Sequence, residues 1–402
     1  MFRRHLESSL LAALGDTPVV LLHGARQTGK TTLARWVSGT KRPGRYLTFD
    51  DISVLASALA DPAGFVAALE GPVVLDEVQR ALPLFPAIKA AVDRDRKPGR
   101  FLLTGSAQVL ILPKLSESLA GRMQVLALWP LSQGEIEGAA EGFLDAAFAR
   151  ALPAMTGKAE ARSDLLARAL RGGFPEAQGR PGDRRREWFE SYLPTILQRD
   201  VRDLSRIEGL ADMPRLFALL AGRATGTLNA ADLSRILAVP LTTLKRYLAL
   251  LEATFLVRLL PAWSANASAR LAKAPKLLLA DTGLLAHLTG ASAERMAIDP
   301  GAAGPLLENF AAMELVKQAA WSRSRPALFH FRTATGREVD LVAEHPDGRV
   351  VGIEVKAAAT VGPSDFRGLE ALREVAGRRF HRGLVLYTGA EALPFGPGLH
   401  AL

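Results

Sequence analysis

The sequence contains no cysteine among its 402 residues. This absence excludes disulfide bonds, thiolate zinc sites and cysteine nucleophiles, so any metal must be bound by oxygen or imidazole ligands. The chain also lacks an uninterrupted apolar run of about 18 residues, the length that a membrane-spanning helix needs. The N-terminal apolar stretch is short and is interrupted by Glu7, which is typical of an amphipathic helix rather than a signal peptide. We therefore expect a cytoplasmic protein without a membrane partner.

Lysine is scarce, because only 11 of the 50 basic residues are lysine and the other 39 are arginine. Against 41 acidic residues they leave a formal net charge of +9, which favours polyanionic partners such as DNA. The arginine excess is equally typical of a GC-rich genome. With 49% hydrophobic and 23% charged residues, the chain has a globular composition, and its length predicts two or three domains.

The first third of the chain alternates short apolar runs with helical stretches. This alternation predicts an α/β fold with a parallel sheet and crossover helices. The expected strands are residues 19–22, 46–49, 73–75, 101–103 and 125–128. A Gly- and Ala-rich stretch at 134–162 shows little pattern and is interpreted as a linker or lid.

The strongest motif is GARQTGKTT, which satisfies the pattern G-x-x-x-x-G-K-[ST] between an expected strand and an expected helix. Its glycines allow successive backbone N–H groups to face phosphates, Lys30 supplies a charge for the β and γ phosphates, and Thr31 offers a hydroxyl to Mg²⁺. We therefore expect a P-loop NTPase sheet with ATP and Mg²⁺ as cofactors. The residues expected at the nucleotide are Gly24, Ala25, Arg26, Gln27, Thr28, Gly29, Lys30, Thr31, Thr32, Asp76 and Ser106.

Polar residues follow two other expected strands. Asp76 and Glu77 end the run GPVVLDEVQ, so Asp76 is expected to hold Mg²⁺ through water and Glu77 to deprotonate the attacking water. Thr104 and Ser106 in FLLTGSAQ are candidates to sense the γ phosphate, although a turn-forming role fits them nearly as well. Arg122 could stabilise a phosphoryl transition state, within the chain or across a subunit contact, or be a solvated surface arginine.

The middle of the chain is mostly helical in pattern. Residues 228–260 give a short helix, a turn, a second helix and a strand-like run, as in a winged helix. Thr242, Thr243, Lys245 and Arg246 lie early on the second helix, where side chains could reach DNA, and a packing or partner-binding role remains open. Asp281 follows an apolar run and is interpreted as a helix cap, with a site residue as the alternative.

The C-terminal region carries a second group of charged residues. The segment GREVDLVAEHPDGRVVGIEVKAAA places Asp340 on one strand and Glu354 and Lys356 on the next. Two carboxylates from paired strands can hold Mg²⁺, and an adjacent lysine can help to activate a water. This is the pattern of a PD-(D/E)XK nuclease core, to which a preceding helix can add a glutamate, here Glu308 or Glu314. The alternative is a hairpin with a polar, solvated face.

The order of these motifs resembles a bacterial and archaeal family of ATPases in which an AAA-type ATP-binding domain is fused to a C-terminal region of unknown function. The resemblance covers nearly the whole chain and rests on GARQTGKTTL, VVLDEVQ, LLTGS, GGFPEA, KLLLADTGLL, LLENFAAMEL, REVDLV and GIEVK, among other segments. Ala25 stands where the family usually has proline. The resemblance implies ATP and magnesium binding by Gly24, Gly29, Lys30 and Thr31, hydrolysis by Asp76 and Glu77, and a nuclease-like end at Asp340, Glu354 and Lys356.

These observations predict three domains: a P-loop AAA-type ATPase at 1–140, a helical domain with a winged helix at 160–292, and a restriction-endonuclease-like α/β domain at 293–402. The leading hypothesis is an ATPase coupled to a nuclease-like domain that acts on nucleic acid. The alternative is an ATP-dependent switch whose nuclease-like fold is catalytically inactive. A homo-oligomer is compatible with either. The expected catalytic residues are Lys30, Glu77, Asp340, Glu354 and Lys356, and the expected metal ligands are Thr31, Asp76, Asp340 and Glu354.

Overall fold

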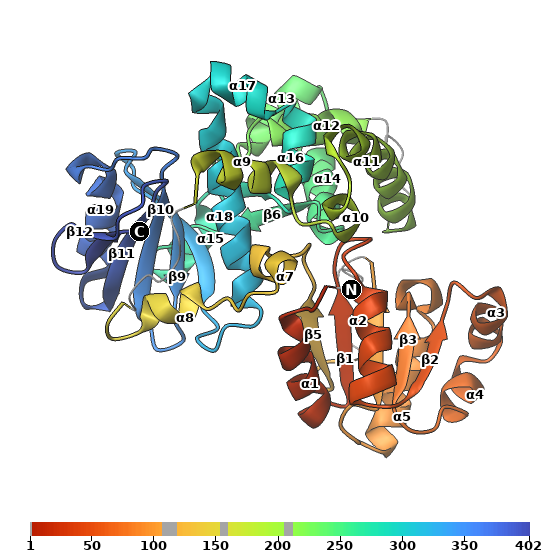
Figure 1. Cartoon of the computed structure of the whole chain (residues 1–402). Coiled ribbons are helices and arrows are strands. Elements are labelled where there is room, and N and C mark those ends of the chain that lie inside the picture. Colours follow the sequence, from red (N-terminus) through yellow and green to blue (C-terminus); the bar gives the residue numbers. More distant parts are fainter. Residues whose placement is uncertain (1, 107–118, 153–159, 205–211) are drawn as a thin grey trace. The chain divides into compact units, whose positions relative to one another are not determined.

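The computed structural model describes residues 2–106, 119–152, 160–204 and 212–402 (Figure 1). The chain divides into two compact units. The N-terminal unit contains Met1–Leu131 with Thr195–Ile207 and Ala249–Leu256, and the second unit contains Ser132–Pro194, Glu208–Leu248 and Val257–Leu402.

The N-terminal unit is built on a five-stranded parallel sheet with the strand order β2-β3-β4-β1-β5. Its strands are β1 (Val19–His23), β2 (Arg45–Thr48), β3 (Val73–Asp76), β4 (Phe101–Gly105) and β5 (Met123–Ala127). The expected α/β fold with a parallel sheet is therefore confirmed. The strands β1, β3 and β4 are buried along their whole length, which is why they lack polar alternation in the sequence.

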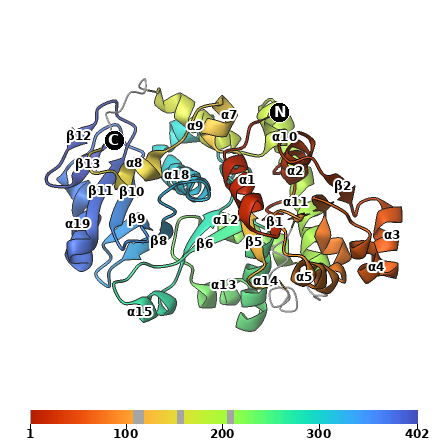
Figure 2. The ribbon, with the colours of Figure 1, turned by 90° about the horizontal axis from the view of Figure 1, so that it is seen from below.

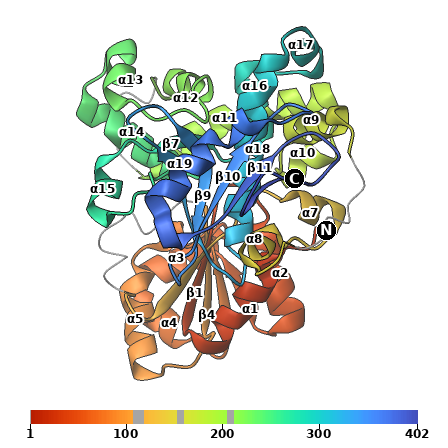
Figure 3. The same ribbon diagram turned by 90° about the vertical axis from the view of Figure 1, so that its left-hand side faces the viewer.

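Helices lie on both sides of this sheet (Figure 3). They are α1 (Leu6–Asp16), α2 (Lys30–Trp36), α3 (Ile52–Ala60), α4 (Pro62–Ala67) and α5 (Leu84–Arg94), with shorter turns at Val37–Lys41 and Val78–Ala81. The side chains of Leu21, Leu75, Phe85 and Phe101 are fully buried in one core cluster between strands and helices. This apolar packing fixes the ends of the strands, where the polar motifs lie.

The second unit begins with helices in the segment that the sequence analysis interprets as a linker. It contains α7 (Gln133–Glu137) and α8 (Phe143–Phe148). The helix α7 starts with a capping box, in which the Ser132 hydroxyl accepts from the Glu135 N–H and the Glu135 carboxylate accepts from the Ser132 N–H. The interpretation of 134–162 as a linker or lid with little pattern is thus wrong where α7 and α8 lie, and the S-x-x-E pattern was the local signal for the start of α7.

The helical middle is confirmed as mostly helical, with two short strands. Ala238 has φ +56° and separates α13 from α14, at the turn that the sequence predicts. The strands β6 and β7 pair antiparallel, Val257 opposite Leu279 and Leu260 opposite Lys276. The elements of this region are α9 (Arg162–Arg171), α10 (Pro175–Gln178), α11 (Gly182–Leu204), α12 (Met213–Ala221), α13 (Ala230–Leu237), α14 (Leu241–Ala253), β6 (Val257–Leu260), α15 (Ala267–Ala272), β7 (Lys276–Leu279), α16 (Thr282–Thr289) and α17 (Ala293–Ile298).

The C-terminal region has a six-stranded sheet with the order β12-β13-β11-β10-β9-β8. The strands β8, β9 and β10 are antiparallel neighbours, and β11 runs parallel to β10 after the crossover helix α19. Figure 2 shows α18 and α19 on opposite sides of these strands. The elements are α18 (Ala303–Ala319), β8 (Ala327–Arg332), β9 (Glu338–Glu344), β10 (Val350–Val355), α19 (Arg367–Ala376), β11 (Phe380–Leu386), β12 (Leu393–Pro394) and β13 (Leu399–Ala401).

One glycine allows α19 to lie directly on the sheet. A Cβ atom on Gly368 would be 1.8 Å from the carbonyl oxygen of Glu338 on β9, far closer than atoms can approach. The apolar face of α19, with Leu369 and Leu372, then packs in a buried cluster with Val339 and Val342 of β9. Among the described residues, no helix is both long enough and apolar enough to cross a bilayer.

Candidate functional site

The loop between β1 and α2 has the backbone of a phosphate-binding loop. Gly24 passes so close to the chain after β5 that a Cβ atom there would be 2.1 Å from the carbonyl oxygen of Leu128. Gly29 has φ +93° and precedes the first residue of α2, a conformation that side-chain-bearing residues rarely adopt. The structure therefore places the motif between a buried strand and a helix N-terminus, where backbone N–H groups and the helix dipole favour anions.

The Lys30 side chain is 5% exposed and lies against its own loop. Its Nζ atom donates to the carbonyl oxygens of Gly24, at 3.0 Å, and Ala25, at 2.7 Å. The Thr28 hydroxyl also donates to the Ala25 carbonyl oxygen, at 2.9 Å. These contacts close the loop into a compact turn and keep the ammonium group within it.

An arginine from the N-terminal segment holds this loop from outside. Arg4 Nη1 donates to the carbonyl oxygen of Thr28 at 2.5 Å, and Nη2 donates to the carbonyl oxygen of Trp129 at 2.7 Å. The sequence analysis missed Arg4 because its partners are 24 and 125 residues away along the chain. Only the order of strands in the sheet brings the three segments together.

Asp76, at the end of β3, lies beside the loop and is 3% exposed. The Thr31 hydroxyl is 3.1 Å and 3.0 Å from its two carboxylate oxygens. The Tyr46 hydroxyl donates to Oδ2 at 2.5 Å, and the Thr104 hydroxyl donates to Oδ1. Burial, followed by the Asp76 carboxylate, raises the pKa of Tyr46 to about 12. Thr31 and Asp76, which the sequence analysis expects at the same metal ion, are thus neighbours, and Thr104 contacts Asp76.

Glu77 follows with φ +60°, an uncommon conformation for a residue with a side chain. Its backbone N–H donates to the Thr104 hydroxyl at 3.2 Å, and its carboxylate accepts from the Gln79 amide. The same amide nitrogen of Gln79 is 3.0 Å from the Ser106 hydroxyl. Gln79, which the sequence analysis missed, therefore connects Glu77 with Ser106 at the end of β4.

Arg122 lies near the amino-terminal ends of the strands β1 and β5, whereas the phosphate loop follows the carboxyl-terminal end of β1. Its neighbour Met123 pairs with Val19, the first residue of β1, whereas the loop follows His23, the last residue of that strand. Arg122 makes an ion pair with Asp93, and this contact is the main cause that lowers the pKa of Asp93. The prediction that Arg122 acts at the phosphate site of its own chain is therefore wrong, because the length of β1, five residues, separates Arg122 from the phosphate loop.

The second unit brings the predicted C-terminal residues together. Lys356 Nζ is 2.8 Å from Glu354 Oε1, and the Asp340 N–H donates to Glu354 Oε2 at 3.3 Å. The Val355 N–H donates to Asp340 Oδ2 at 2.9 Å. Both carboxylates are 7% exposed. Burial is the main cause that raises the pKa of Glu354, and the Asp340 charge adds to it.

A second lysine, Lys276 of β7, completes this carboxylate–lysine cluster. Its Nζ is 2.5 Å from Glu308 Oε1 and 2.9 Å from Asp340 Oδ1, and the residue is 4% exposed. Burial raises the pKa of Glu308. Burial by itself lowers the pKa of Lys276, but the charges of Asp340 and Glu308 outweigh it, so the pKa of Lys276 is raised above its usual value. The sequence offered one signal that was overlooked, a lysine at the start of the apolar run KLLLA.

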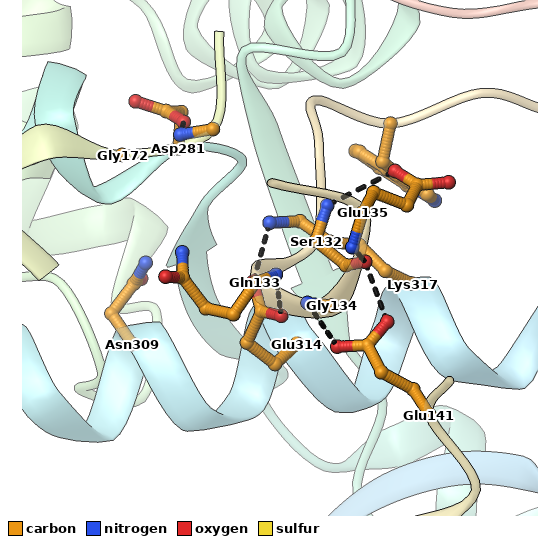
Figure 4. Close-up of polar contacts among 12 residues, drawn as sticks. Ser132, Gln133, Gly134, Glu135, Glu141, Gly172, Asp281, Asn309, Glu314 and Lys317 are labelled. Carbon is orange, nitrogen blue, oxygen red and sulfur yellow. Dashed lines mark hydrogen bonds and ion pairs between the residues drawn. The ribbon is translucent and has the colours of Figure 1, made fainter. Parts of the chain in front are cut away.

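Of the two candidate glutamates on α18, Glu308 belongs to this cluster. Glu314 instead accepts from the Gln133 N–H at 2.8 Å and from Lys317 Nζ at 2.7 Å (Figure 4). In the same close-up, Glu141 accepts from Ser132 and Gly134. Glu314 therefore anchors the start of α7. Among the described residues, no group of three or more histidine and acidic side chains is arranged to hold a metal ion.

Asp281 has the capping role that the sequence analysis favours. Its Oδ1 accepts from the Leu284 N–H of α16 at 3.0 Å, and its Oδ2 accepts from the Gly173 N–H at 2.6 Å. A Cβ atom on Gly172 would be 2.3 Å from Asp281 Oδ1, and Figure 4 shows the two residues side by side. The aspartate thus joins the GGF turn to the start of α16.

On α14, Thr242, Lys245 and Arg246 are exposed and Thr243 is half-buried. These side chains are therefore available at the surface, on the helix where the sequence analysis places them.

Comparison with known proteins assigns three regions of the chain to sequence families. Residues 16–137 match the sequence-family model described as an AAA domain. Residues 162–295 and 303–402 match two models described as domains of unknown function, DUF8612 and DUF4143. Together with the parallel sheet and the phosphate loop, the first match defines the N-terminal region as an AAA-family P-loop domain with an ATPase-like fold.

The chain belongs to the family of Uncharacterized protein Rv2008c of Mycobacterium tuberculosis and Uncharacterized protein Mb2031c of Mycobacterium bovis. It is 34% identical to each over 395 residues, which are 98% of this chain and 81% of either relative. Among solved structures, the Thermotoga maritima RuvB Holliday junction branch migration motor matches with 18% identity and a TM-score of 0.31, over 64% of this chain and 89% of that one. AMPPCP-bound DnaA from Aquifex aeolicus matches with 14% identity and a TM-score of 0.29, over 61% and 85%. These structural similarities are too low for a comparison of sites.

Proposed function

We propose that this protein binds ATP with Mg²⁺ and hydrolyses it at the site formed by the loop 24–32, Asp76 and Glu77. The observation that carries the proposal is the Thr31 hydroxyl, which lies 3.0 Å and 3.1 Å from the two carboxylate oxygens of Asp76 beside the phosphate loop. A hydroxyl and a carboxylate at this separation are the oxygen ligands that P-loop proteins offer to Mg²⁺. The bound ion would neutralise charge on the β and γ phosphates.

The residues of the loop bind the phosphates. Lys30 donates to loop carbonyl oxygens at 2.7 Å and 3.0 Å, and an ammonium group bonds more strongly to a phosphate than to a neutral carbonyl. It can therefore exchange these partners for the β and γ phosphates. Arg4 fixes the carbonyl group of Thr28 from outside the loop. The backbone N–H groups of the loop are therefore held in place for the phosphates.

Glu77 is the residue that orients and deprotonates the attacking water. Its carboxylate is fixed by Gln79, which also contacts the Ser106 hydroxyl. This arrangement lets Ser106 influence Glu77 through Gln79, so we assign Ser106 and Gln79 as positioning residues. Asp76 is held by three hydroxyl groups and serves the metal rather than the water.

Substitutions of Glu77 and Lys30 test this proposal. Glu77→Gln should leave ATP affinity unchanged and lower turnover about 100-fold or more, because the amide cannot accept the proton. Lys30→Ala should weaken ATP binding about 100-fold, since a charge-assisted contact is lost. The exposed residues Glu70 and Lys41 provide matched controls as Glu70→Gln and Lys41→Ala. Unchanged turnover in Glu77→Gln removes Glu77 from catalysis, and unchanged ATP binding in Lys30→Ala rejects the nucleotide site.

For the C-terminal region, the finer proposal is a restriction-endonuclease-like fold. The order α18, β8, β9, β10, α19, β11 supports it, with three antiparallel strands followed by a helix and a parallel strand. Asp340, Glu354 and Lys356 lie together on the paired strands. However, Lys276 Nζ contacts Asp340, one of the two expected metal ligands, at 2.9 Å and fills the place between Asp340 and Glu308. The residues present therefore do not fit a metal in this conformation.

This occupied position favours the ATP-dependent switch over the coupled nuclease. In the switch, nucleotide state sets the conformation of the chain and the nuclease-like fold does not cut. Cleavage of linear, circular and single-stranded DNA with Mg²⁺ or Mn²⁺, with and without ATP, tests it. No cleavage by the wild type is the expected result. Cleavage that Lys356→Ala abolishes would instead establish a nuclease at Asp340, Glu354 and Lys356.

DNA remains the candidate macromolecular partner, through a winged helix formed by α12 to α14 with β6 and β7. The exposed side chains of Thr242, Lys245 and Arg246 at the start of α14 support it, as does the net charge of +9. If phosphate contacts contribute, DNA affinity should fall steeply with salt, and Lys245→Ala with Arg246→Ala should reduce the slope by about 2. Lys97→Ala, at an exposed site on the N-terminal unit, is the control. Binding that ignores salt would reject the DNA proposal.

The proposed domain division keeps three parts, at 1–140, 160–292 and 293–402. A homo-oligomer is proposed with it, since Arg122 could act only at a neighbouring subunit's site. Sedimentation of the protein with and without ATP measures the subunit number, and a monomer under both conditions rejects that role.

A further inference from the structure

Lys276 is a buried lysine whose ammonium group lies between two carboxylates. Its side chain is buried, and Nζ contacts one carboxylate from α18 and one from β9, at 2.5 Å and 2.9 Å. A lysine is buried this deeply only when its charge is compensated. Lys276 and Lys356 together place two ammonium groups among the three carboxylates of Glu308, Asp340 and Glu354.

The backbone holds Lys276 in this position. Lys276 pairs with Leu260 of β6 and, on its other side, with Thr227. Three residues further along β7, the Asn309 side chain donates to the Leu279 carbonyl oxygen and accepts from the Leu279 N–H, both at 2.9 Å. Asn309 follows Glu308 on α18, so the same two neighbouring residues anchor the strand and the ammonium group. Lys276 is therefore a fixed part of the cluster and not a flexible surface lysine.

A divalent cation and this ammonium group compete for one place. An ion bound by Glu308 and Asp340 would have to lie within about 2.5 Å of their oxygens, where Nζ already lies at 2.5 Å and 2.9 Å. Two cations cannot share this place, because like charges a few ångströms apart in a poorly solvated site repel strongly. The described residues contain no group of three or more acidic or histidine side chains arranged to hold a metal ion.

We infer that Lys276 is the resident cation of the C-terminal carboxylate cluster and excludes divalent metal ions from it. The inference does not depend on ATP hydrolysis by the N-terminal unit. Lys276 supplies from within the chain the positive charge that lies between Glu308 and Asp340, so the C-terminal region needs no metal to keep these two carboxylates together. Replacing Lys276 by a neutral residue converts the cluster into a metal site, since the uncompensated carboxylates then require another cation or protons.

Direct titration with MnCl₂ tests the inference on the full chain. All proteins carry Asp76→Asn, which removes the proposed metal ligand of the nucleotide site, and no nucleotide is added. Bound Mn²⁺ is measured by electron paramagnetic resonance. The chain with Lys276 should bind no Mn²⁺ that depends on Asp340, whereas Lys276→Met should gain about one bound ion per chain. Adding Asp340→Asn to Lys276→Met should abolish the gain. Lys273→Met, an exposed lysine three residues earlier, should change nothing.

Two results would overturn the inference. The first is Mn²⁺ binding by the chain with Lys276 that Asp340→Asn removes, because the ammonium group would then not exclude the ion. The second is a folded Lys276→Met protein without bound Mn²⁺, since the lysine would then not be what keeps the metal out. Circular dichroism reports whether Lys276→Met folds. If it does not, Lys276→Gln, which keeps N–H donors for both carboxylates, takes its place under the same two criteria.

Discussion

We predict that His23, the last residue of β1, makes the free energy of unfolding depend on pH. Its side chain is 5% exposed, and its ring packs edge-on against Phe255 with the centroids 4.8 Å apart. Burial, followed by the charge of Lys30, lowers the pKa of His23 from 6.5 to about 4. Between these values the unfolded chain binds a proton at His23 and the folded chain does not. The free energy of unfolding therefore falls as the pH falls through this range.

The size of the effect follows from the shift. At 1.36 kcal/mol per pKa unit, a shift from 6.5 to about 4 limits the loss to about 3 kcal/mol, and at about pH 5 the loss is about 2 kcal/mol. His23→Leu removes the titrating group and keeps an apolar side chain. Urea titrations followed by circular dichroism at about pH 7.5 and about pH 5 should show the wild type losing about 2 kcal/mol more than the variant.

The comparison between the two proteins isolates His23. His330 also has its pKa lowered to about 4, by burial first, but it is present in both proteins and cancels in the difference. Equal losses in the wild type and in His23→Leu would refute the reasoning, because His23 would then take up its proton equally well in the folded chain. A larger loss in the variant would do so as well.

Three further predictions concern single contacts. Arg4→Ala should weaken ATP binding about tenfold, because it frees the carbonyl group of Thr28. Calorimetry measures the affinity, and the exposed Arg3→Ala is the control. Equal ATP affinities of Arg4→Ala and the wild type would contradict a role of Arg4 in holding the loop. Asp281→Ala should lower the free energy of unfolding by about 2 kcal/mol, since it leaves the Gly173 and Leu284 N–H groups unpaired, and no change in urea unfolding would reject this role. Gly368→Ala should lower the free energy of unfolding by about 1–3 kcal/mol, because the new Cβ atom would displace α19 from Glu338. Gly362→Ala, at a position with no neighbouring atom within 4 Å, should leave it unchanged.

The sequence predicted the features whose signals are local. The phosphate loop lies within nine residues, and each strand of the N-terminal sheet overlaps one short, mostly apolar run, so both could be located without knowing the fold. The proximity of Asp340, Glu354 and Lys356 could also be predicted, because they lie on two strands joined by one hairpin. Alternation along paired strands determines on which face of the sheet each side chain lies. The order of the strands was not predicted, since it depends on packing between segments far apart in the chain.

The residues that the sequence analysis missed act on partners distant in sequence. Arg4 reaches Trp129, Tyr46 reaches Asp76, and Lys276 reaches Asp340, over 125, 30 and 64 residues. No periodicity or motif marks such pairs. For Arg122, the register of β5 against β1 excludes a contact with the phosphate loop of the same chain, and its ion pair with Asp93 fits the surface arginine that was the other interpretation.

The contacts of β7 limit how nucleotide state could act on the C-terminal region. Withdrawing Lys276 from the carboxylate cluster by moving β7 along α18 would break two ion pairs and both bonds between Asn309 and Leu279. Each charged contact is worth about 1.5–3 kcal/mol and each neutral one about 1 kcal/mol, so the movement would cost more than a typical coupling free energy of about 1–3 kcal/mol. A switch in this protein must therefore move β7, α18 and the strands bearing Asp340 and Glu354 as one body, with Lys276 still in its place.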